Sequence, residues 1–215
     1  MKLMRVHTCL SVVALALAAP RARGDDASLP EAELSPRTSF SVTAAGAWAP
    51  PLRIFGGVHE EGRKTGLLQL QVRRTLDRNE GHVLEWVFAV VPLELESDTP
   101  VSAHSPSSGQ PPGRSTVYGA GINPLGLSMR FGNGSWRPFW NLSGGLRMFG
   151  DRVPIPRGTN FNFTADVGVG VYRPLSSRLA VTIGLDLHHV SNGNLGEKNP
   201  GVNYLLLTMG FLPTR

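Results

Sequence analysis

The sequence is poor in cysteine and in long hydrophobic runs. Its 215 residues contain one cysteine, Cys9, which lies ahead of the apolar stretch Leu10–Ala19. A single cysteine excludes an internal disulfide, and lipid attachment requires a cysteine after the apolar part of a signal rather than before it. Beyond residue 24 the longest apolar run covers about 87–93, so no segment reaches the ~18 apolar residues of a transmembrane helix.

The chain also has little surplus charge. The formal net charge is +5, but four of the 21 basic side chains lie in the first 24 residues, where there is no acidic one. The remaining residues carry 17 basic and 16 acidic side chains. A nucleic-acid-binding domain needs a clear excess of positive charge, so we expect no nucleic-acid partner.

The first 24 residues have the pattern of an export signal. A basic start precedes the apolar stretch, and Ala22-Arg23-Gly24 offers small residues at the usual cleavage spacing. An N-terminal helix of the folded domain is disfavoured, because Pro20 ends the apolar run and no amphipathic face follows. The predicted organisation is a signal peptide over 1–24, a flexible lead over 25–36 and a β-barrel domain over 37–215.

The rest of the chain repeats strand-like segments of about ten residues or more, rich in Val, Leu, Phe and Gly and separated by turn residues. Helical periodicity is nowhere sustained. The eight predicted strands are 38–48, 65–75, 82–95, 115–131, 136–149, 160–173, 177–190 and 202–212.

The connections between these segments alternate in length. Those after the second, fourth and sixth segments are short, and the long ones are 49–64, 96–114, 150–159 and 191–201. Long loops on one rim, short turns on the other and an even strand number are typical of outer-membrane barrels. We therefore predict an all-β fold, an eight-stranded antiparallel outer-membrane β-barrel, with an exported soluble, calycin-like binding barrel as the less favoured alternative.

Alternation within the segments agrees with this fold. From Phe163 to Val171 every odd residue is apolar and every even one is polar or glycine. In a membrane barrel the apolar face meets lipid and the polar face fills the interior, whereas a soluble barrel turns its apolar face inward. The sequence leaves open whether the polar residues of these strands are buried or exposed, among them Arg130, Arg147, Asp166 and Asp186.

Common catalytic and metal motifs are absent, including HExxH, CxxC, phosphate-binding loops and Gly-x-Ser-x-Gly. The sequence implies no metal or other cofactor. The remaining candidate is His188-His189-Val190-Ser191-Asn192-Gly193-Asn194, at the end of the seventh segment. It is followed by Asn199 and by Asn203 at the start of the eighth.

Parity predicts which way these side chains point. His189 and Ser191 continue the apolar face of the seventh segment, and Asn203 shares the parity of the apolar face of the eighth. All three are therefore expected on the lipid-facing surface near the outer rim. Residues two apart on one face are roughly 6.6 Å apart along the strand, and a cross-strand neighbour lies about 5 Å away.

This geometry permits a nucleophilic esterase site. Ser191 is the candidate nucleophile, His189 the base and Asn203 the group that orients the imidazole. Candidates for the oxyanion site are backbone amides of the Gly-rich turn and side chains there: Asn192, Gly193 and Asn199. The plainer interpretation also stands, because Ser-Asn-Gly-Asn is an ordinary turn and histidine is common at a barrel rim.

The spacing of His189-Val-Ser191-Asn192-Gly193, Asn199 and Gly201-Val202-Asn203 resembles the signature of lipid A 3-O-deacylases of the PagL type, also called acyloxyacyl hydrolases. The similarity is strongest over 179–212. Segments 116–127 and 160–164 also resemble exported members of this group. Known members fold as eight-stranded outer-membrane barrels with a Ser-His-acid site on the lipid-facing wall.

The resemblance implies Ser191 as nucleophile, His189 as base and position 203 as the orienting residue. The best-known pattern has glutamate at that position, where this chain has Asn203. Glu197 in the connecting loop is the alternative acid, since Asp186 faces inward by parity. Replacement of the triad carboxylate by an amide in a serine protease lowers the rate about 10⁴-fold, so the departure bears on turnover more than on fold.

These observations predict a carboxylic ester hydrolase of the Gram-negative outer membrane that removes an ester-linked acyl chain from lipid A, at the 3-O position by resemblance. The alternative from another class is a non-catalytic structural or adhesive barrel. The expected partners are lipid A and the membrane, with a homodimer left open. Candidate phosphate ligands are the loop arginines Arg53, Arg63, Arg114, Arg152 and Arg157.

Overall fold

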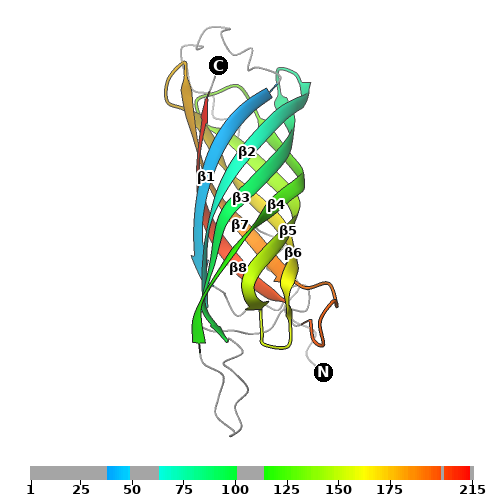
Figure 1. Cartoon of the computed structure of the whole chain (residues 1–215). Coiled ribbons are helices and arrows are strands. Elements are labelled where there is room, and N and C mark those ends of the chain that lie inside the picture. Colours follow the sequence, from blue (N-terminus) through cyan, green and yellow to red (C-terminus); the bar gives the residue numbers. More distant parts are fainter. Residues whose placement is uncertain (1–37, 49–62, 101–113, 200, 214–215) are drawn as a thin grey trace, which may run out of the picture.

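The computed structural model describes residues 38–48, 63–100, 114–199 and 201–213. Within these ranges the chain forms a closed β-barrel (Figure 1), and no described helix is long and apolar enough to cross a membrane. The proposed signal peptide and N-terminal lead lie outside the described residues. The strands are β1 (Thr38–Trp48), β2 (Lys64–Arg78), β3 (His82–Pro100), β4 (Arg114–Phe131), β5 (Arg137–Val153), β6 (Thr159–Pro174), β7 (Leu179–Ser191) and β8 (Val202–Pro213).

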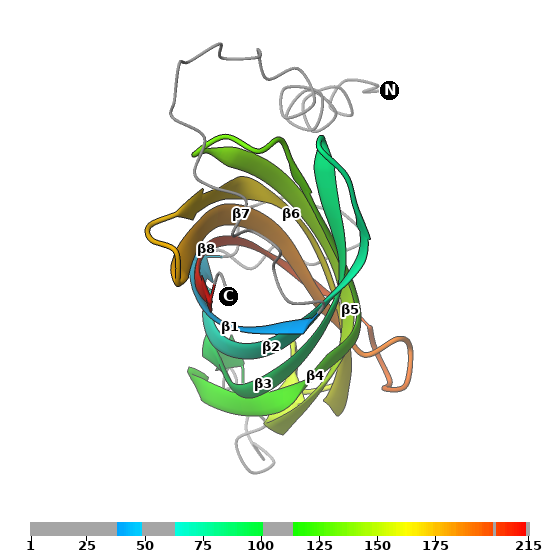
Figure 2. The same ribbon diagram turned by 90° about the horizontal axis from the view of Figure 1, so that it is seen from above.

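Each strand pairs antiparallel with the next, and β8 closes the barrel by pairing with β1 (Figure 2). The predicted eight-stranded antiparallel fold is confirmed, and every predicted segment overlaps one strand. Strands β3 and β5 run furthest beyond their predicted ends, to Pro100 and to Val153. Their last residues look like loop by composition, but backbone pairing to β4 and to β6 keeps them in the sheet.

Strands β1, β3, β5 and β7 end at one end of the barrel, the lower end in Figure 1, which we call the outer rim. Three of the connections after these strands are long, as expected. The fourth spans only 154–158, because β5 and β6 extend into the predicted loop. The first residue of β1 and the last of β8 lie at the opposite rim, beside the short turns.

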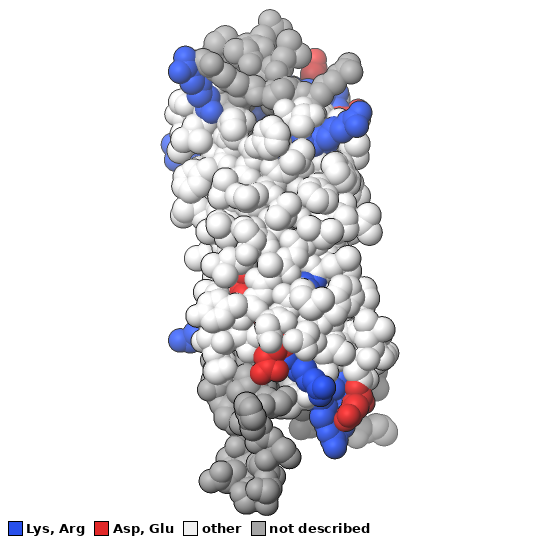
Figure 3. Space-filling view, viewed as in Figure 1, with Lys and Arg blue, Asp and Glu red and all other residues white. Residues whose placement is uncertain are grey.

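The outer wall of the barrel is apolar. Side chains such as Val167, Leu185 and Leu207 alternate outward and are 46%, 50% and 57% exposed. Figure 3 shows a largely uncharged band between charged residues that gather toward the two ends. Alternation of this kind, with the apolar face outside, is that of a barrel whose wall contacts lipid.

The interior is filled by charged and polar side chains. Arg147 Nε donates to Glu94 Oε2 at 2.5 Å, and its Nη1 donates to Asn123 Oδ1 at 2.7 Å. A second group joins Arg73 and Arg130 to Glu85. The four polar strand residues whose direction the sequence left open all point inward and are buried: Arg130, Arg147, Asp166 and Asp186.

The expectation that the loop arginine Arg63 is a phosphate ligand is wrong. Its side chain is fully buried, and its Nε lies 3.7 Å from Glu96 Oε2 inside the barrel. The residue stands directly before β2, so it points into the barrel mouth rather than toward lipid phosphates. Arg53 and the side chain of Arg114 lie outside what the structure describes.

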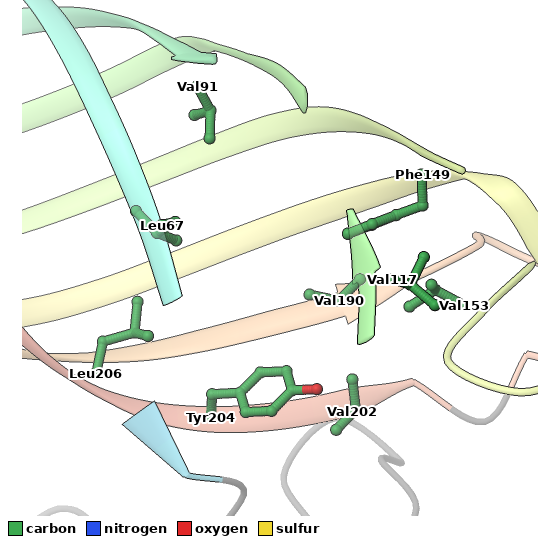
Figure 4. Close-up of a cluster of buried hydrophobic side chains, with 9 residues drawn as sticks. All are labelled: Leu67, Val91, Val117, Phe149, Val153, Val190, Val202, Tyr204 and Leu206. Atoms are coloured by element: carbon green, nitrogen blue, oxygen red, sulfur yellow. The ribbon is translucent and has the colours of Figure 1, made fainter. Parts of the chain in front are cut away.

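A cluster of buried apolar side chains lies inside the barrel toward the outer rim (Figure 4). Val190 of β7 and Val202 of β8 are fully buried in this cluster. They are the chain neighbours of His189 and Asn203, so inward packing fixes the two strands at the level of the candidate residues. The cluster comprises Leu67, Val91, Val117, Phe149, Val153, Val190, Val202, Tyr204 and Leu206.

Candidate active site

A hydrogen bond between β7 and β8 forms the centre of the site. His189 and Asn203 are directly opposite one another in the strand register. The His189 Nδ1 and Asn203 Oδ1 atoms are 2.8 Å apart. An amide oxygen can only accept, so Nδ1 carries the proton in this bond and the neutral imidazole has its lone pair on Nε2. That is the tautomer a general base requires.

Ser191 is the last residue of β7, two positions beyond His189 on the same face. Its cross-strand neighbour on β6 is Phe163, and that of His189 is Ala165. Ser191 and His189 are both half-buried. Strand geometry separates their Cα atoms by roughly 6.6 Å, a gap that an imidazole leaning along the strand spans.

The side chains point as parity predicted, with one difference. His189 lies on the outer wall, while its neighbour His188 is fully buried inside. Asn203 shares the outward parity of Leu205 and Leu207, yet it is only 2% exposed. The expectation of a lipid-exposed Asn203 is therefore wrong. Its burial strengthens the hydrogen bond to His189, because water does not compete for the amide oxygen.

The turn after β7 is held by the side chain of Asn192, which is fully buried. Its Nδ2 donates to the Lys198 carbonyl at 2.8 Å, and its Oδ1 accepts from the Asn194 amide at 3.0 Å. The backbone N–H of Asn192 donates to Asn199 Oδ1 at 3.0 Å. Asn192 thus shapes the turn, and Asn199 has its Nδ2 as the group that can donate further.

Two glycines with positive φ shape the turn beside the site. Gly193 has φ of 60° and Gly201 has φ of 41°, a region that favours glycine. A Cβ on Gly201 would lie 2.7 Å from His189 Cε1 and 3.3 Å from Nε2. The Cε1 atom of the imidazole therefore lies beside Gly201, where there is no space for a side chain.

Glu197, the alternative acid, lies in the exposed turn. Its carboxylate is 3.6 Å from Arg157 Nε, and the two side chains are 72% and 63% exposed. The Lys198 amide donates to the Arg157 carbonyl at 3.3 Å, so the turn after β7 is joined to the 154–158 connection. Asn203 occupies the Nδ1 side of the imidazole, where Glu197 would have to act.

Sequence reasoning missed the polar groups directly behind the site. His188 contacts Asp166 through Nδ1, and its Nε2 is 3.4 Å from Glu94 Oε1. The Ser143 hydroxyl donates to Asp166 Oδ2 at 2.6 Å. The signal was present as polar residues at inward positions of β5, β6 and β7. Their partners were not predictable, because β3 and β7 lie far apart in the sequence.

An apolar groove of about 840 Å³ runs along the outer wall, on the side of the site away from the outer rim. It lies over β5, β6 and β7 and reaches β8 at Leu207. Leu185, in this groove, is four residues before His189 on the same face of β7, a distance of about 13 Å along the strand. The exposed side chains that line it include Leu142, Val167, Ile183, Leu185 and Leu207.

Comparison with known proteins agrees with this architecture. Residues 84–211, more than half of the chain, match the model of the lipid A 3-O-deacylase (PagL) family, while no curated protein matches the sequence. The crystal structure of the outer membrane enzyme PagL is similar with a TM-score of 0.59 and 16% identity, over 79% of this chain and 97% of that one. Neisserial surface protein A (NspA) has a TM-score of 0.47 and 12% identity, over 83% and 97%.

The likeness to the PagL structure shows the fold, an eight-stranded outer-membrane barrel. The family match extends from β3 to β8 and includes Ser191, His189 and Asn203. The protein is thus an outer-membrane barrel of a Gram-negative bacterium, and the chain belongs to the lipid A 3-O-deacylase (PagL) family.

Proposed function

We propose that this protein is a serine esterase that hydrolyses an ester-linked acyl chain of lipid A, at the 3-O position named by its family. The observation that carries the proposal is the hydrogen bond between His189 and Asn203 on the lipid-facing wall, with Ser191 two residues further along the same face. A serine with an oriented histidine on the same face is the arrangement of a nucleophile and its base.

The reaction follows from these roles. The Ser191 hydroxyl attacks the ester carbonyl while His189 Nε2 takes its proton, which gives a tetrahedral oxyanion. The oxyanion collapses, the bond to the sugar oxygen breaks, and His189 returns the proton to that oxygen. Water, activated by the same base, then attacks the acyl-serine, which releases the fatty acid and restores Ser191.

Asn203 is the positioning residue in this mechanism. Amide replacement of a triad aspartate is costly chiefly because it favours the wrong tautomer. Here Oδ1 of Asn203 faces Nδ1, so the productive tautomer is kept. What the amide lacks is a negative charge to stabilise the imidazolium, so turnover is expected to be slower than with a carboxylate at this position.

Hydrogen-bond donors in the turn after β7 stabilise the oxyanion. Gly193 offers a backbone N–H in an exposed segment, and Asn199 offers its Nδ2. Asn192 supports both, because its backbone and side-chain hydrogen bonds fix the turn from beneath. Removing one oxyanion donor typically lowers kcat about 10²-fold to 10³-fold.

The membrane setting accounts for substrate access. Lipid A of the outer leaflet lies beside the wall, so its acyl chain reaches Ser191 without leaving the membrane. The apolar groove between His189 and the opposite rim is suited to the acyl chain, and the rim arginines Arg152 and Arg157 are suited to the phosphates. Lipid A therefore fits the apolar groove with its acyl chain and the arginines of the outer rim with its phosphates.

Mass spectrometry of lipid A from cells that produce the wild-type chain or Ser191→Ala tests the proposal. The wild type alone is expected to remove the mass of one acyl chain, and that mass identifies the chain. Ser177→Ala, in the exposed turn at the opposite rim, is the matched control and should behave as the wild type. Both variants must be present in the outer membrane as folded barrels.

Deacylation that survives Ser191→Ala would rule out the assigned nucleophile. Unchanged lipid A with the wild type, together with no labelling of Ser191 by a fluorophosphonate probe, would instead favour a non-catalytic barrel.

A further inference from the structure

Phe163 lies directly across from the nucleophile. It pairs with Ser191 in the register of β6 and β7, and its side chain points outward with 39% of its surface exposed. Facing residues on one side of a sheet have Cβ atoms about 5 Å apart, so the ring borders the position that an ester must occupy at Ser191.

The Phe163 ring is held on two sides. Phe161 contacts it edge-to-face, with ring centroids 5.3 Å apart and an interplanar angle of 83°. A Cβ on Gly193 would lie 2.8 Å from Phe163 Cε2, so the ring also packs against the turn that carries the oxyanion donors. An aromatic group fixed in this way offers a preorganised surface beside the reaction centre.

The order of residues along β7 sets the direction of the substrate. From Ser191 toward the middle of the barrel, the outer face continues through His189 to Leu187 and Leu185, so the acyl chain extends that way into the apolar groove. The alcohol side of the ester must then lie at the level of Ser191 or nearer the rim. Phe163 and Phe161 occupy that level on the neighbouring strand.

We propose that the Phe163 ring stacks against a sugar ring of the substrate and so selects acylated sugars over other esters of the same fatty acid. The inference rests on the proposed function and adds the group that recognises the alcohol side. The C–H groups on one face of a pyranose carry partial positive charge, which an aromatic face attracts through its quadrupole. A wall aromatic that only contacts membrane lipid would make no such distinction.

The test compares two substrates with the full-length refolded barrel: lipid A and an ethyl ester of the same acyl chain, which has neither a sugar nor an aromatic ring. Phe163→Leu keeps an apolar side chain but removes the aromatic face. We expect kcat/KM for lipid A to fall about fivefold more than that for the ethyl ester, which corresponds to about 1 kcal/mol. The difference should lie mainly in KM, and Phe163→Tyr should restore it.

Phe40→Leu is the matched control. Phe40 is an exposed aromatic on the outer wall of β1, near the opposite rim, and is 66% exposed. Its replacement should leave the ratio of the two substrates unchanged. An equal loss on both substrates with Phe163→Leu, or no loss on lipid A, would overturn the stacking role.

A binding measurement separates this inference from the proposed function. In the Ser191→Ala chain, Phe163→Leu should raise the Kd for micellar lipid A about fivefold relative to its effect on the free fatty acid. This readout needs no turnover. If binding changes as expected but the chain that keeps Ser191 shows no esterase activity, the esterase is contradicted and the sugar contact is kept. Unchanged binding would reject the contact alone.

Discussion

His188 and His189 are adjacent in the chain, yet their imidazoles lie on opposite sides of the barrel wall. His188 is fully buried and contacts Asp166 and Glu94 in the interior. His189 lies on the outer wall and is hydrogen-bonded to Asn203. The alternation of a single strand therefore places one histidine in the packing of the barrel and the other in the candidate active site.

The two histidines should separate stability from activity. His188→Gln leaves the buried carboxylates of Asp166 and Glu94 without their shared partner, so the free energy of unfolding should fall by about 3 kcal/mol. His189→Gln should change it by less than about 1 kcal/mol but abolish deacylation. Denaturant unfolding of the refolded barrels and lipid A turnover measure the two effects. Equal losses of stability in the two variants would contradict the placement of His188 inside the barrel and His189 on its outer wall.

Asn203 provides a second prediction. Asn203→Leu removes the acceptor for Nδ1–H and should lower kcat about 10²-fold or more, within the usual contribution of acid–base catalysis. Asn203→Asp keeps an acceptor oxygen and adds charge beside the imidazolium, so it should raise kcat above that of the wild type. Single-turnover acylation with a nitrophenyl ester measures both. A fall with Asn203→Asp larger than that with Leu would show that burial of the carboxylate dominates.

Much of this arrangement was predictable because strand alternation is a local property. The odd positions from Phe163 to Val171 predicted the outer wall, and the same parity predicted that His189 and Ser191 share a face. The cross-strand partner of His189 followed from the short distance in sequence between β7 and β8. Sequence was therefore sufficient for the fold and for the principal residues proposed for the site.

What the sequence could not predict depends on contacts between distant segments. The burial of Arg63 against Glu96 requires the start of β2 to lie against the inner face of β3. Asn203 has outward parity but is buried. Strand alternation predicts the direction of a side chain but not whether neighbouring residues cover it. The packing of Phe163 on Gly193 depends likewise on how the turn after β7 folds back over β6.

Gly201 gives a third prediction. Gly201→Ala places a methyl group 2.7 Å from His189 Cε1 and strains a backbone with φ of 41°, so the imidazole must move from its position. A displacement of about 1 Å in a catalytic group lowers the rate about 10²-fold. Gly132→Ala is the control, because Gly132 has φ of 77° but nothing within 4 Å of its Cβ position. If both variants lose only stability and keep kcat, the imidazole is not constrained by Gly201.

The apolar groove gives the last prediction. Val169 lies in the groove, in the same cross-strand row as Leu185, about 13 Å from the His189 row. Val169→Trp fills the far part of the groove, so chains long enough to reach it lose contact while shorter chains do not. Each methylene bound in an apolar site contributes about 0.8 kcal/mol, or about fourfold in kcat/KM.

For nitrophenyl esters of increasing length, kcat/KM of the wild type should therefore continue to rise after that of Val169→Trp has levelled off. Val42→Trp, on the outer wall of β1, adds the same bulk away from the groove and should keep the wild-type dependence on length. If kcat/KM of Val169→Trp rises in parallel with that of the wild type at every chain length, the acyl chain lies elsewhere on the wall. In that case the strand order that directs the chain from Ser191 past His189 toward Leu185 would not describe the bound substrate.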